Sequence, residues 1–480
     1  MKKQTSIHNI ILYVFVIIFG LFLLLYVGFS FYFTKHFFFH TTINGIDVSL
    51  KNTEQTEELL ANQCKEYKLQ ITGRNNTTGT ITAQDINLEY LSNNMIEHYL
   101  QEQNSFLWFL CFFQPQQKEV NNCVSYDAET LKKEIKKLPF FQKENKITPT
   151  NAYVTYLEDE GFCIVNETQG SIPIFDAVHD AILSCIQNNE TELSLDNTDC
   201  YKKPSITSDH PDLVALWETV NLYNSSIITY NFGNRTEVVD TNLIKDWLKI
   251  NSKKFKVKID QNKVRTFVDY IGKTYNTFGK TRTFLASTGN KVTVSGGDYG
   301  WLLNREKETK QLIKLIKKGA VKTKKPSYLQ KAASHSKKDW GKTYVEINLT
   351  AQHIWYYKNG ELLVDSDFVS GSLIRGWGTP QGVYDITYIQ RDVILGVNSN
   401  ASYRTPVTYW MPFNGNIGLH DATWRNKFGG SIYKTNGSHG CVNLPYETAR
   451  IIFENISAGV PVICYYDSEY LTKQDTQENT

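Results

Sequence analysis

The stretch from Ile417 to Pro445 reads IGLHDATWRNKFGGSIYKTNGSHGCVNLP and holds two histidines and a cysteine, in a chain with only 10 His and 8 Cys among 480 residues. A cysteine attacks as its thiolate, and a neighbouring imidazole either lowers the pKa of the thiol or takes its proton. Gly440 allows a tight turn beside Cys441, so backbone N–H groups can face a developing oxyanion. The stretch therefore indicates a nucleophilic site with Cys441 and His420 as the reacting groups.

A metal site and a buried structural cysteine are the alternative interpretations of this stretch. His420, His439 and Cys441 supply three ligands, but no fourth follows at a standard spacing. The Ser-His-Gly-Cys setting is polar, whereas Cys111 and Cys185 have the apolar neighbours expected of a buried structural cysteine. Papain-like peptidases carry Cys before His in the chain, and here His420 comes first. The residues favour acyl transfer that needs neither metal nor cofactor.

The sequence around this stretch predicts a mostly β domain over residues 342–467. Residues 344–349 alternate between apolar and polar side chains, and Asn359-Gly360 is typical of a hairpin turn. Only residues 447–455 look helical. A linker is expected at 331–341, where the end of a Lys-rich stretch suggests solvated chain, and a polar tail at 468–480.

These residues resemble a known family. His420 followed by Ser438-His439-Gly440-Cys441-Val442-Asn443 is similar to the signature of the L,D-transpeptidase (YkuD-type) catalytic domain. Thr379-Pro380-Gln381-Gly382-Val383-Tyr384 is similar to the Thr-Pro-x-Gly-x-Phe/Tyr motif of the same family. The resemblance covers about residues 342–466.

The resemblance implies a cysteine acyltransferase. Cys441 would attack a tetrapeptide stem of peptidoglycan, expel D-alanine and form a thioester, which an amine of a neighbouring stem would resolve into a 3→3 cross-link. His420 would be the proton donor and acceptor, oriented by the side chain or the backbone carbonyl of Asp421. Backbone N–H groups of His439 and Gly440 would form the oxyanion hole. The candidate substrate-binding residues are Ser438, Asn443, Arg425 and Trp410.

Three other outcomes stay open at this stage. Water as acceptor would make the protein an L,D-carboxypeptidase, and a protein amine would make it an enzyme that attaches proteins to the wall. A non-catalytic wall-binding protein is the third. Asn443 stands where many members of the family carry Arg, so a carboxylate contact would fall to Arg425 or Arg404. The resemblance also implies that carbapenems acylate Cys441.

The region before the catalytic domain contains an internal repeat. Tyr126-Asp127 and Ile259-Asp260 each open an amphipathic helical pattern, and a β-like segment ending in glycine and a second helix follow in each copy. The offset is about 130 residues, which argues for two copies of one α+β module. The expected bounds are 41–205 and 206–330. Both copies resemble the peptidoglycan-binding modules that precede this catalytic domain in membrane-anchored enzymes of Gram-positive bacteria.

The N-terminus predicts a membrane anchor. Residues 10–33 are almost wholly apolar and, as a helix, would rise about 36 Å, enough to cross a hydrocarbon core of about 30 Å. The run is too long for the core of a signal peptide and ends in bulky aromatic residues. Lys2 and Lys3 precede it, which predicts a cytoplasmic tip within residues 1–40 and a catalytic domain facing the cell wall.

Composition sets the remaining limits. The formal net charge is +2, so no global field favours nucleic acid as a partner. An aromatic content of 13% excludes an intrinsically disordered chain. The expected fold is a multidomain chain: a transmembrane helix, two α+β repeat modules and a C-terminal mostly-β L,D-transpeptidase domain. The expected partners are peptidoglycan stem peptides and the cytoplasmic membrane, and the sequence does not indicate an oligomeric state.

Overall fold

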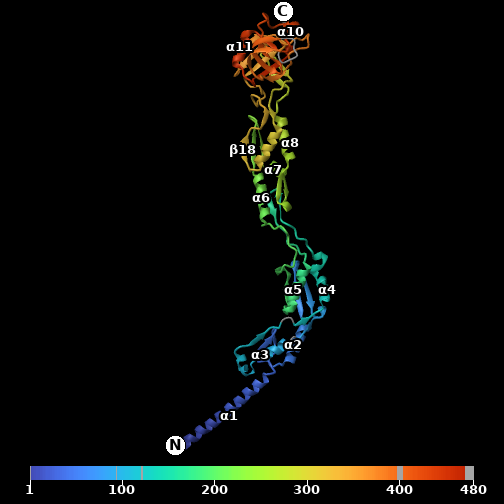
Figure 1. Cartoon of the computed structure of the whole chain (residues 1–480), viewed down its shortest axis with the longest axis vertical. Helices are drawn as coiled ribbons and strands as arrows, with labels where there is room; N and C mark the ends of the chain where they lie inside the picture. Colours follow the sequence, from blue (N-terminus) through green and yellow to red (C-terminus); the bar gives the residue numbers. More distant parts are fainter. Residues whose placement is uncertain (1, 93, 121–122, 397–403, 471–480) are drawn as a thin grey trace. The chain divides into compact units, whose positions relative to one another are not determined.

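The computed structural model describes residues 2–92, 94–120, 123–396 and 404–470, with no side chains given for residues 2–6 (Figure 1). The chain forms two compact units. One comprises Met1–Thr155 and Cys163–Val214, and the other comprises Tyr156–Phe162 and Ala215–Thr480. Residues 471–480 of the expected polar tail lie outside the described residues.

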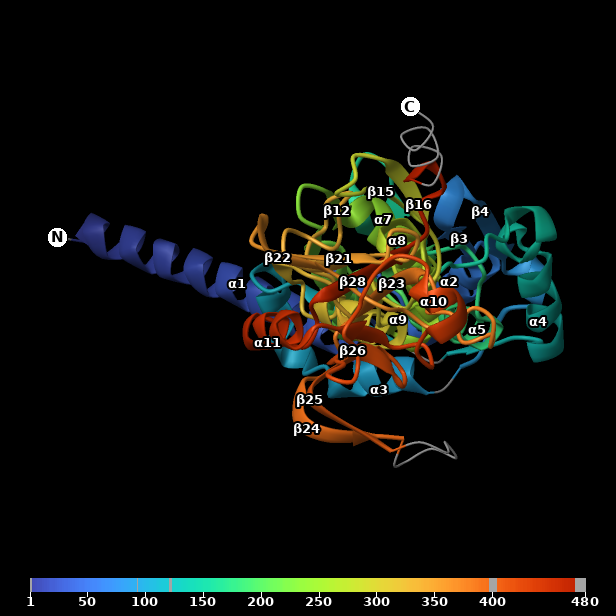
Figure 2. The same cartoon turned by 90° about the horizontal axis from the view of Figure 1, so that it is seen from above.

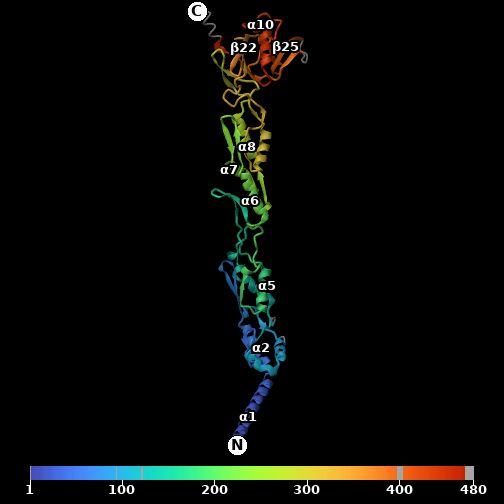
Figure 3. The same cartoon turned by 90° about the vertical axis from the view of Figure 1, so that its left-hand side faces the viewer.

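The first unit begins with α1 (Lys2–Tyr32), drawn in dark blue in Figures 1 and 3. The most apolar 18 residues of its segment Ile7–Tyr32 have a mean hydropathy of 3.1 and are not buried in the protein. At 1.5 Å per residue, 26 residues extend about 39 Å, which exceeds the hydrocarbon core of a bilayer. Within the described residues, α1 is the one helix long and apolar enough to cross a membrane.

A small subdomain follows α1. Its three-stranded sheet has the order β2-β1-β6, and a 3-10 helix, η3 (Ser105–Phe112), returns the chain to α1. Its other elements are β1 (Thr41–Ile43), β2 (Ile46–Asp47), α2 (Thr53–Lys65), β5 (Glu89–Tyr90), α3 (Met95–Glu102), β6 (Gln116–Lys118) and β7 (Val124–Ser125). Asn52 caps α2 through a reciprocal pair of hydrogen bonds with Gln55.

The first repeat module has a sheet of order β10-β3-β4, in which β3 pairs parallel with β10 and antiparallel with β4. Its strands and helices are β3 (Lys68–Thr72), β4 (Thr78–Thr82), α4 (Ala128–Lys137), β8 (Tyr153–Leu157), β9 (Gly161–Val165), α5 (Phe175–Gln187) and β10 (Glu192–Ser194). Its core includes Cys185 of α5, which is buried as the sequence predicted.

The second repeat module has the same plan. Its sheet has the order β12-β11-β18, with β11 pairing antiparallel with β12 and parallel with β18. Its elements are α6 (Pro211–Asn224), β11 (Ile227–Asn231), β12 (Thr236–Val239), α7 (Thr241–Trp247), β13 (Leu248–Asn251), β14 (Lys256–Ile259), α8 (Gln261–Tyr275), β15 (Arg282–Leu285), β16 (Lys291–Val294), β17 (Leu302–Leu303), α9 (Arg305–Ile316), β18 (Val321–Lys324) and β19 (Tyr328–Gln330). The predicted duplication is confirmed.

The aspartates that open the repeat explain where its helices begin. The Asp127 carboxylate accepts hydrogen bonds from backbone N–H groups of the first turn of α4, and the Asp260 carboxylate does the same for α8. A carboxylate at this position satisfies N–H groups that have no partner within the helix.

The catalytic domain contains two sheets. Their orders are β22-β21-β20-β28-β23 and β24-β25-β26-β27. The elements are β20 (Tyr344–Asn348), β21 (His353–Lys358), β22 (Glu361–Asp367), β23 (Gly382–Asp385), β24 (Gln390–Leu395), β25 (Thr405–Asn414), β26 (Ile417–Asp421), α10 (Ile432–Asn436), β27 (Val442–Leu444), α11 (Tyr446–Asn455) and β28 (Pro461–Tyr465). Figure 2 shows β24 and β25 extending away from the rest of this domain.

The β15–β16 hairpin of the second module packs against the catalytic domain. Phe284 and Val294 share one buried cluster with Val383 of β23 and Tyr465 of β28. The stretch 331–341 was expected to be solvated, and the structure differs, because Trp340 belongs to the same buried cluster.

Candidate active site

Parallel pairing of β26 with β27 brings the predicted histidine and cysteine together. His420 stands opposite Asn443, and Leu419 stands opposite Val442, the residue after Cys441. Because side chains alternate along a strand, His420, Asn443 and Cys441 face the same side of the sheet. All three line one cavity of about 190 Å³.

The backbone carbonyl of Asp421 orients His420, which settles the choice that the sequence left open. The Nδ1 atom of His420 lies 2.8 Å from that oxygen. A carbonyl only accepts, so Nδ1 carries the hydrogen and Nε2 of the neutral ring is the basic nitrogen. The Asp421 carboxylate instead accepts from the N–H of Tyr409 at 2.7 Å. Burial lowers the pKa of His420, so the imidazole is neutral at pH 7.

The Cys441 thiol is also held in its neutral form. Its side chain is buried, and this burial raises the pKa of Cys441 to about 11, although a backbone hydrogen bond from Gly418 acts in the opposite direction. The thiol donates to the carbonyl of Asn416 at 3.5 Å. The cavity therefore holds a neutral thiol and a neutral imidazole.

Two hydroxyl groups fix the turn that carries Cys441. The Ser438 hydroxyl donates to the carbonyl of Cys441 at 2.5 Å and accepts from the N–H of Gly440 at 3.0 Å. The Thr379 hydroxyl donates to the carbonyl of Gly440 at 2.7 Å and accepts from the N–H of Gly371 at 3.1 Å. Gly440 has φ +119°, a conformation that favours glycine. Ser438 thus shapes the turn from within, and the N–H of Gly440 is engaged in it.

Arg425 supplies a cation at the cavity. It lines the cavity, and burial lowers the pKa of its guanidinium. Its Nε atom is buried and has no hydrogen-bond partner within the described residues. Trp424 lines the same cavity with 49% of its surface exposed, and its ring lies 5.8 Å from that of His420.

Two residues that the sequence offered as substrate contacts do not line the cavity within the described residues. Trp410 is 5% exposed, packs in one buried cluster with Cys441, and is not among the described residues that line the cavity. Its indole N–H donates to the Tyr388 hydroxyl at 3.3 Å. Arg404 donates to the carbonyl of Gly396 at 2.6 Å and likewise does not line the cavity within the described residues.

The side chain of His439 faces outward from the same turn. It lines the cavity, and its ring stacks on Trp377 with the centroids 4.2 Å apart. Partial burial and the charge of Arg375 lower its pKa.

Sequence reasoning did not single out several residues of this site. Leu395 and Thr405 line the cavity from the ends of β24 and β25, and no sequence signal marks them. Thr379 was noticed only as part of a motif, and its contact with Gly440 explains why a hydroxyl stands there.

The chain was compared with known proteins. Residues 342–464 match the family described as "L,D-transpeptidase catalytic domain" (YkuD), and residues 79–190 and 218–324 match the family described as "Putative peptidoglycan binding domain". A comparison with curated proteins found no match.

Three solved structures illustrate what the chain is similar to. An Enterococcus faecium L,D-transpeptidase, crystallised as a cysteine-to-serine mutant, is 32% identical over 52% of this chain and 98% of that chain, with a TM-score of 0.45. The catalytic domain of an E. faecium L,D-transpeptidase acylated by ertapenem is 38% identical over 26% of this chain and 98% of that chain, with a TM-score of 0.24. An L,D-transpeptidase from Mycobacterium smegmatis is 22% identical over 26% of this chain and 58% of that chain, with a TM-score of 0.23.

The family match at residues 342–464 contains both His420 and Cys441. The 32% identity extends over nearly the whole of the enterococcal chain. This chain therefore belongs to the L,D-transpeptidases, the acyltransferases that cross-link peptidoglycan.

Proposed function

We propose that the protein is a membrane-anchored enzyme that forms 3→3 cross-links through a thioester on Cys441. The observation that carries this proposal is the cavity shared by Cys441 and His420, in which Nδ1 of His420 is committed to the carbonyl of Asp421. Nε2 is then the nitrogen able to take a proton. Neutral thiol and neutral imidazole are the states from which such a transfer begins.

The first half of the reaction forms the thioester. The proton of the Cys441 thiol passes to Nε2 of His420 as the sulfur bonds to the carbonyl carbon between the third stem residue and the terminal D-alanine. The carbon–nitrogen bond to D-alanine breaks, and the imidazolium returns the proton to the leaving amine. In the second half, an amine of a neighbouring stem attacks the thioester, gives its proton to His420, and restores the thiol as the sulfur leaves.

The turn around Cys441 would stabilise the oxyanion. The N–H of Gly440 already donates to Ser438, so it can serve only if this bond opens. The N–H of Cys441 and that of His439 complete the proposed donor set. Arg425, with its Nε lacking a partner among the described residues, is the proposed contact for a stem carboxylate. Asn443 lines the same cavity and would orient the peptide.

The rest of the chain fits this activity. With α1 in the cytoplasmic membrane and its N-terminus inside, the catalytic domain would lie on the same side as the cell wall. The two repeat modules would bind peptidoglycan. No nucleic acid is needed at any step.

The test uses the full chain in detergent micelles with a disaccharide-tetrapeptide that contains a diamino acid. Mass spectrometry should find a dimer lacking one D-alanine, and Cys441→Ala should abolish it. Ser431→Ala is the control variant and should keep activity. Ser431 lies in the segment that connects β26 to β27 and is not among the described residues that line the cavity. A Cys441-dependent tripeptide without dimer would indicate an L,D-carboxypeptidase. The absence of any Cys441-dependent product would leave protein attachment or a non-catalytic wall-binding role.

Carbapenems should acylate the same sulfur. The E. faecium catalytic domain described above was solved as an ertapenem adduct, and a strained lactam carbonyl offers this thiol a comparable electrophile. Intact-mass spectra should show one adduct per chain, absent from Cys441→Ala. An active enzyme without an adduct would contradict the proposed nucleophile.

A further inference from the structure

A short aromatic segment beside α1 has no place in the functions above. Residues 105–113 read SFLWFLCFF, contain no charged side chain, and include η3. Most of these side chains are exposed to an extent unusual for apolar groups in a soluble protein: Phe106 54%, Leu107 43%, Phe109 40%, Leu110 40%, Phe112 54% and Phe113 81%. A contiguous apolar surface of this kind marks an interaction site.

The other face of this segment is fixed to the end of α1. The Tyr26 hydroxyl donates to the carbonyl of Phe106 at 2.7 Å. The ring of Trp108 lies 5.1 Å from that of Phe29 and 6.0 Å from that of Phe33, centroid to centroid. These contacts set the height of the segment along the helix axis.

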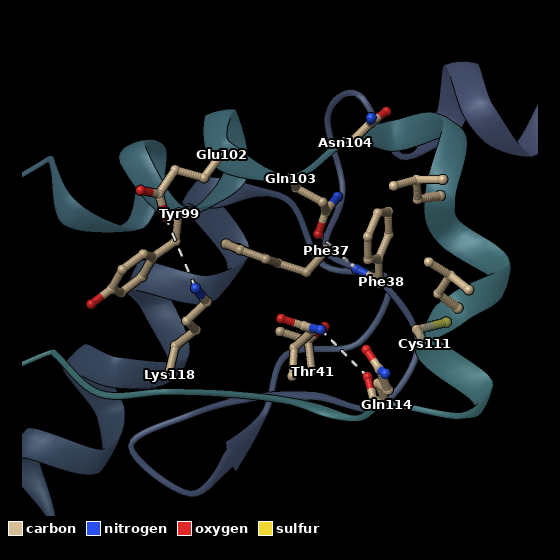
Figure 4. Close-up of a pocket in the computed structure, with 13 residues that line it drawn as sticks. Phe37, Phe38, Thr41, Tyr99, Glu102, Gln103, Asn104, Cys111, Gln114 and Lys118 are labelled. Carbon is tan, nitrogen blue, oxygen red and sulfur yellow. Dashed lines mark hydrogen bonds and ion pairs between the residues drawn. The ribbon is translucent and has the colours of Figure 1, made fainter.

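Gln103 holds the chain just before the aromatic segment. Its side-chain amide donates to the carbonyls of Phe33 and His36 at 3.0 and 2.8 Å, and its oxygen accepts from the N–H of Phe38 at 3.2 Å. Figure 4 shows this bond to Phe38, with Cys111 on the adjoining helix. The attachment fixes the start of the aromatic segment to the chain that directly follows α1.

The depth of the segment follows from its contact with Tyr26. Tyr26 comes six residues before the end of α1 at Tyr32, which corresponds to about 9 Å along the axis. Interfacial elements lie about 5–10 Å into the boundary between headgroups and acyl chains, and Trp and Tyr are enriched there. If α1 spans the bilayer, residues 105–113 lie at that depth.

Two cavities adjoin the segment, and they differ in polarity. On the side of α1, a groove of about 460 Å³ runs between Phe22 and Phe29 of the helix and Trp108 and Phe109 of the segment. A second cavity, of about 280 Å³, has a mixed lining that includes the charged Glu102 and Lys118 beside Leu107 and Leu110 of the segment (Figure 4). The groove suits an acyl chain, and the cavity opens where headgroups and water are expected.

We propose that residues 105–113 form a second membrane contact, lying in the outer leaflet beside α1 with a phospholipid acyl chain in the groove. The inference rests on the proposed anchor, because the depth is measured along α1. The apolar face of residues 105–113 continues the surface of α1 that would face lipid, which argues for lipid rather than a protein partner. The contact would hold the first unit at two points of the membrane surface.

The experiment places the full chain in vesicles of phosphatidylcholine and phosphatidylglycerol that contain a photoreactive phospholipid. One probe carries its diazirine near the glycerol ester, and the other near the methyl end of the acyl chain. After illumination, labelled peptides are mapped by mass spectrometry. The shallow probe should label residues 105–113, and the deep probe should label the middle of α1.

A matched pair of variants tests the exposed face. Phe109→Ser with Phe113→Ser should remove the labelling of residues 105–113 and leave α1 labelled. Phe278→Ser is the control, because Phe278 is 39% exposed against 40% for Phe109 and belongs to the other unit. Unchanged melting of the protein would show that the fold is intact.

The outcomes separate this proposal from the anchor. If α1 is labelled and residues 105–113 are not, the anchor stands and the second contact is wrong, with water or a protein covering the face. If neither is labelled, the anchor itself is wrong. Labelling that persists in the double variant would also overturn the role of the exposed face.

Discussion

The two repeat modules share a plan, yet their hairpins meet different surroundings. The β15–β16 hairpin belongs to a buried cluster with the catalytic domain. The tip of the β8–β9 hairpin instead contacts α6, where the indole N–H of Trp217 donates to the carbonyl of Phe162 at 2.7 Å, and Trp217 stays 36% exposed. The same supersecondary unit thus forms part of a core in one copy and a surface contact in the other.

Polar contacts repeat this contrast. Arg282 and Asp339 form an ion pair of 2.7 Å with side chains 6% and 3% exposed. Lys245 and Glu158 form one of 3.2 Å with side chains 22% and 80% exposed. The difference teaches that duplication conserves the strands and helices of a module, while the residues at the hairpin decide whether it merges with its neighbour.

The largest expected effect comes from breaking the buried pair. Arg282→Met should destabilise the catalytic domain by about 3–5 kcal/mol, because it leaves the Asp339 carboxylate buried without its cation. Calorimetry of the full chain in detergent should show this as a lower melting temperature for that domain. Lys245→Met is the counterpart at the exposed pair and should leave melting nearly unchanged. If both variants lowered the melting temperature equally, the proposed difference between the two hairpins would be wrong.

Two glycines give a second matched pair. A Cβ at Gly297 would lie 2.0 Å from the carbonyl oxygen of Val383, whereas a Cβ at Gly161 would meet nothing within 4 Å. Both have positive φ, +81° and +76°. Gly161→Ala should cost about 1–2 kcal/mol for the left-handed backbone alone. Gly297→Ala should cost about 3 kcal/mol or more, because overpacking adds to that strain.

These two variants separate backbone strain from close approach. The measurement is the melting temperature together with transpeptidation activity. Gly297→Ala should lower both if the close approach of the segment after β16 to Val383 supports the catalytic domain. A variant that melts lower with unchanged activity would show that this segment only stabilises the catalytic domain.

The smallest effect concerns pH. Glu346 is fully buried and accepts hydrogen bonds from the N–H of Ser287 and the hydroxyl of Tyr465, yet burial raises its pKa above 4.5. The folded state therefore holds the proton more tightly than the unfolded state. The stability that Glu346 contributes is fully present below pH 4.5, the unfolded value, and is lost as pH rises through the folded pKa.

Glu346→Gln should flatten this dependence. The melting temperature of the catalytic domain should fall less between about pH 4.5 and neutrality than in the natural chain, since the amide does not ionise. Glu158→Gln is the control at the first hairpin, where the side chain is 80% exposed. A pH dependence that survives in Glu346→Gln would assign it to another group.

The sequence predicted the helices and strands of the repeat, but it did not predict the contacts that join the second module to the catalytic domain. Asp127 and Asp260 predict where their helices begin, because an N-cap residue and an amphipathic pattern are local signals in the sequence. Asp339 belongs to the expected solvated linker, yet it is buried in an ion pair with Arg282, 57 positions away. Pairing between distant polar residues leaves no trace in local periodicity, so the expected solvated linker proved to be partly core.

The candidate site divides in the same way. Cys441 and His420 could be named because a thiol and an imidazole beside a glycine turn are rare in this chain. The sequence could not decide which oxygen orients His420, nor reveal that Trp410 packs in a buried cluster with Cys441. Those facts depend on side-chain direction across the β25–β26 pairing, where Trp410 stands opposite His420.

The parallel pairing of β26 with β27 has a consequence for how such enzymes can vary. The ladder places His420 beside the turn of Cys441, and the connecting segment between the strands does not set that distance. Trp424 and Arg425 belong to the connection and line the cavity. We expect that the connection can lengthen, shorten or change its side chains while His420 keeps its register with the strand after Cys441, which makes the connection a suitable place to redesign the cavity.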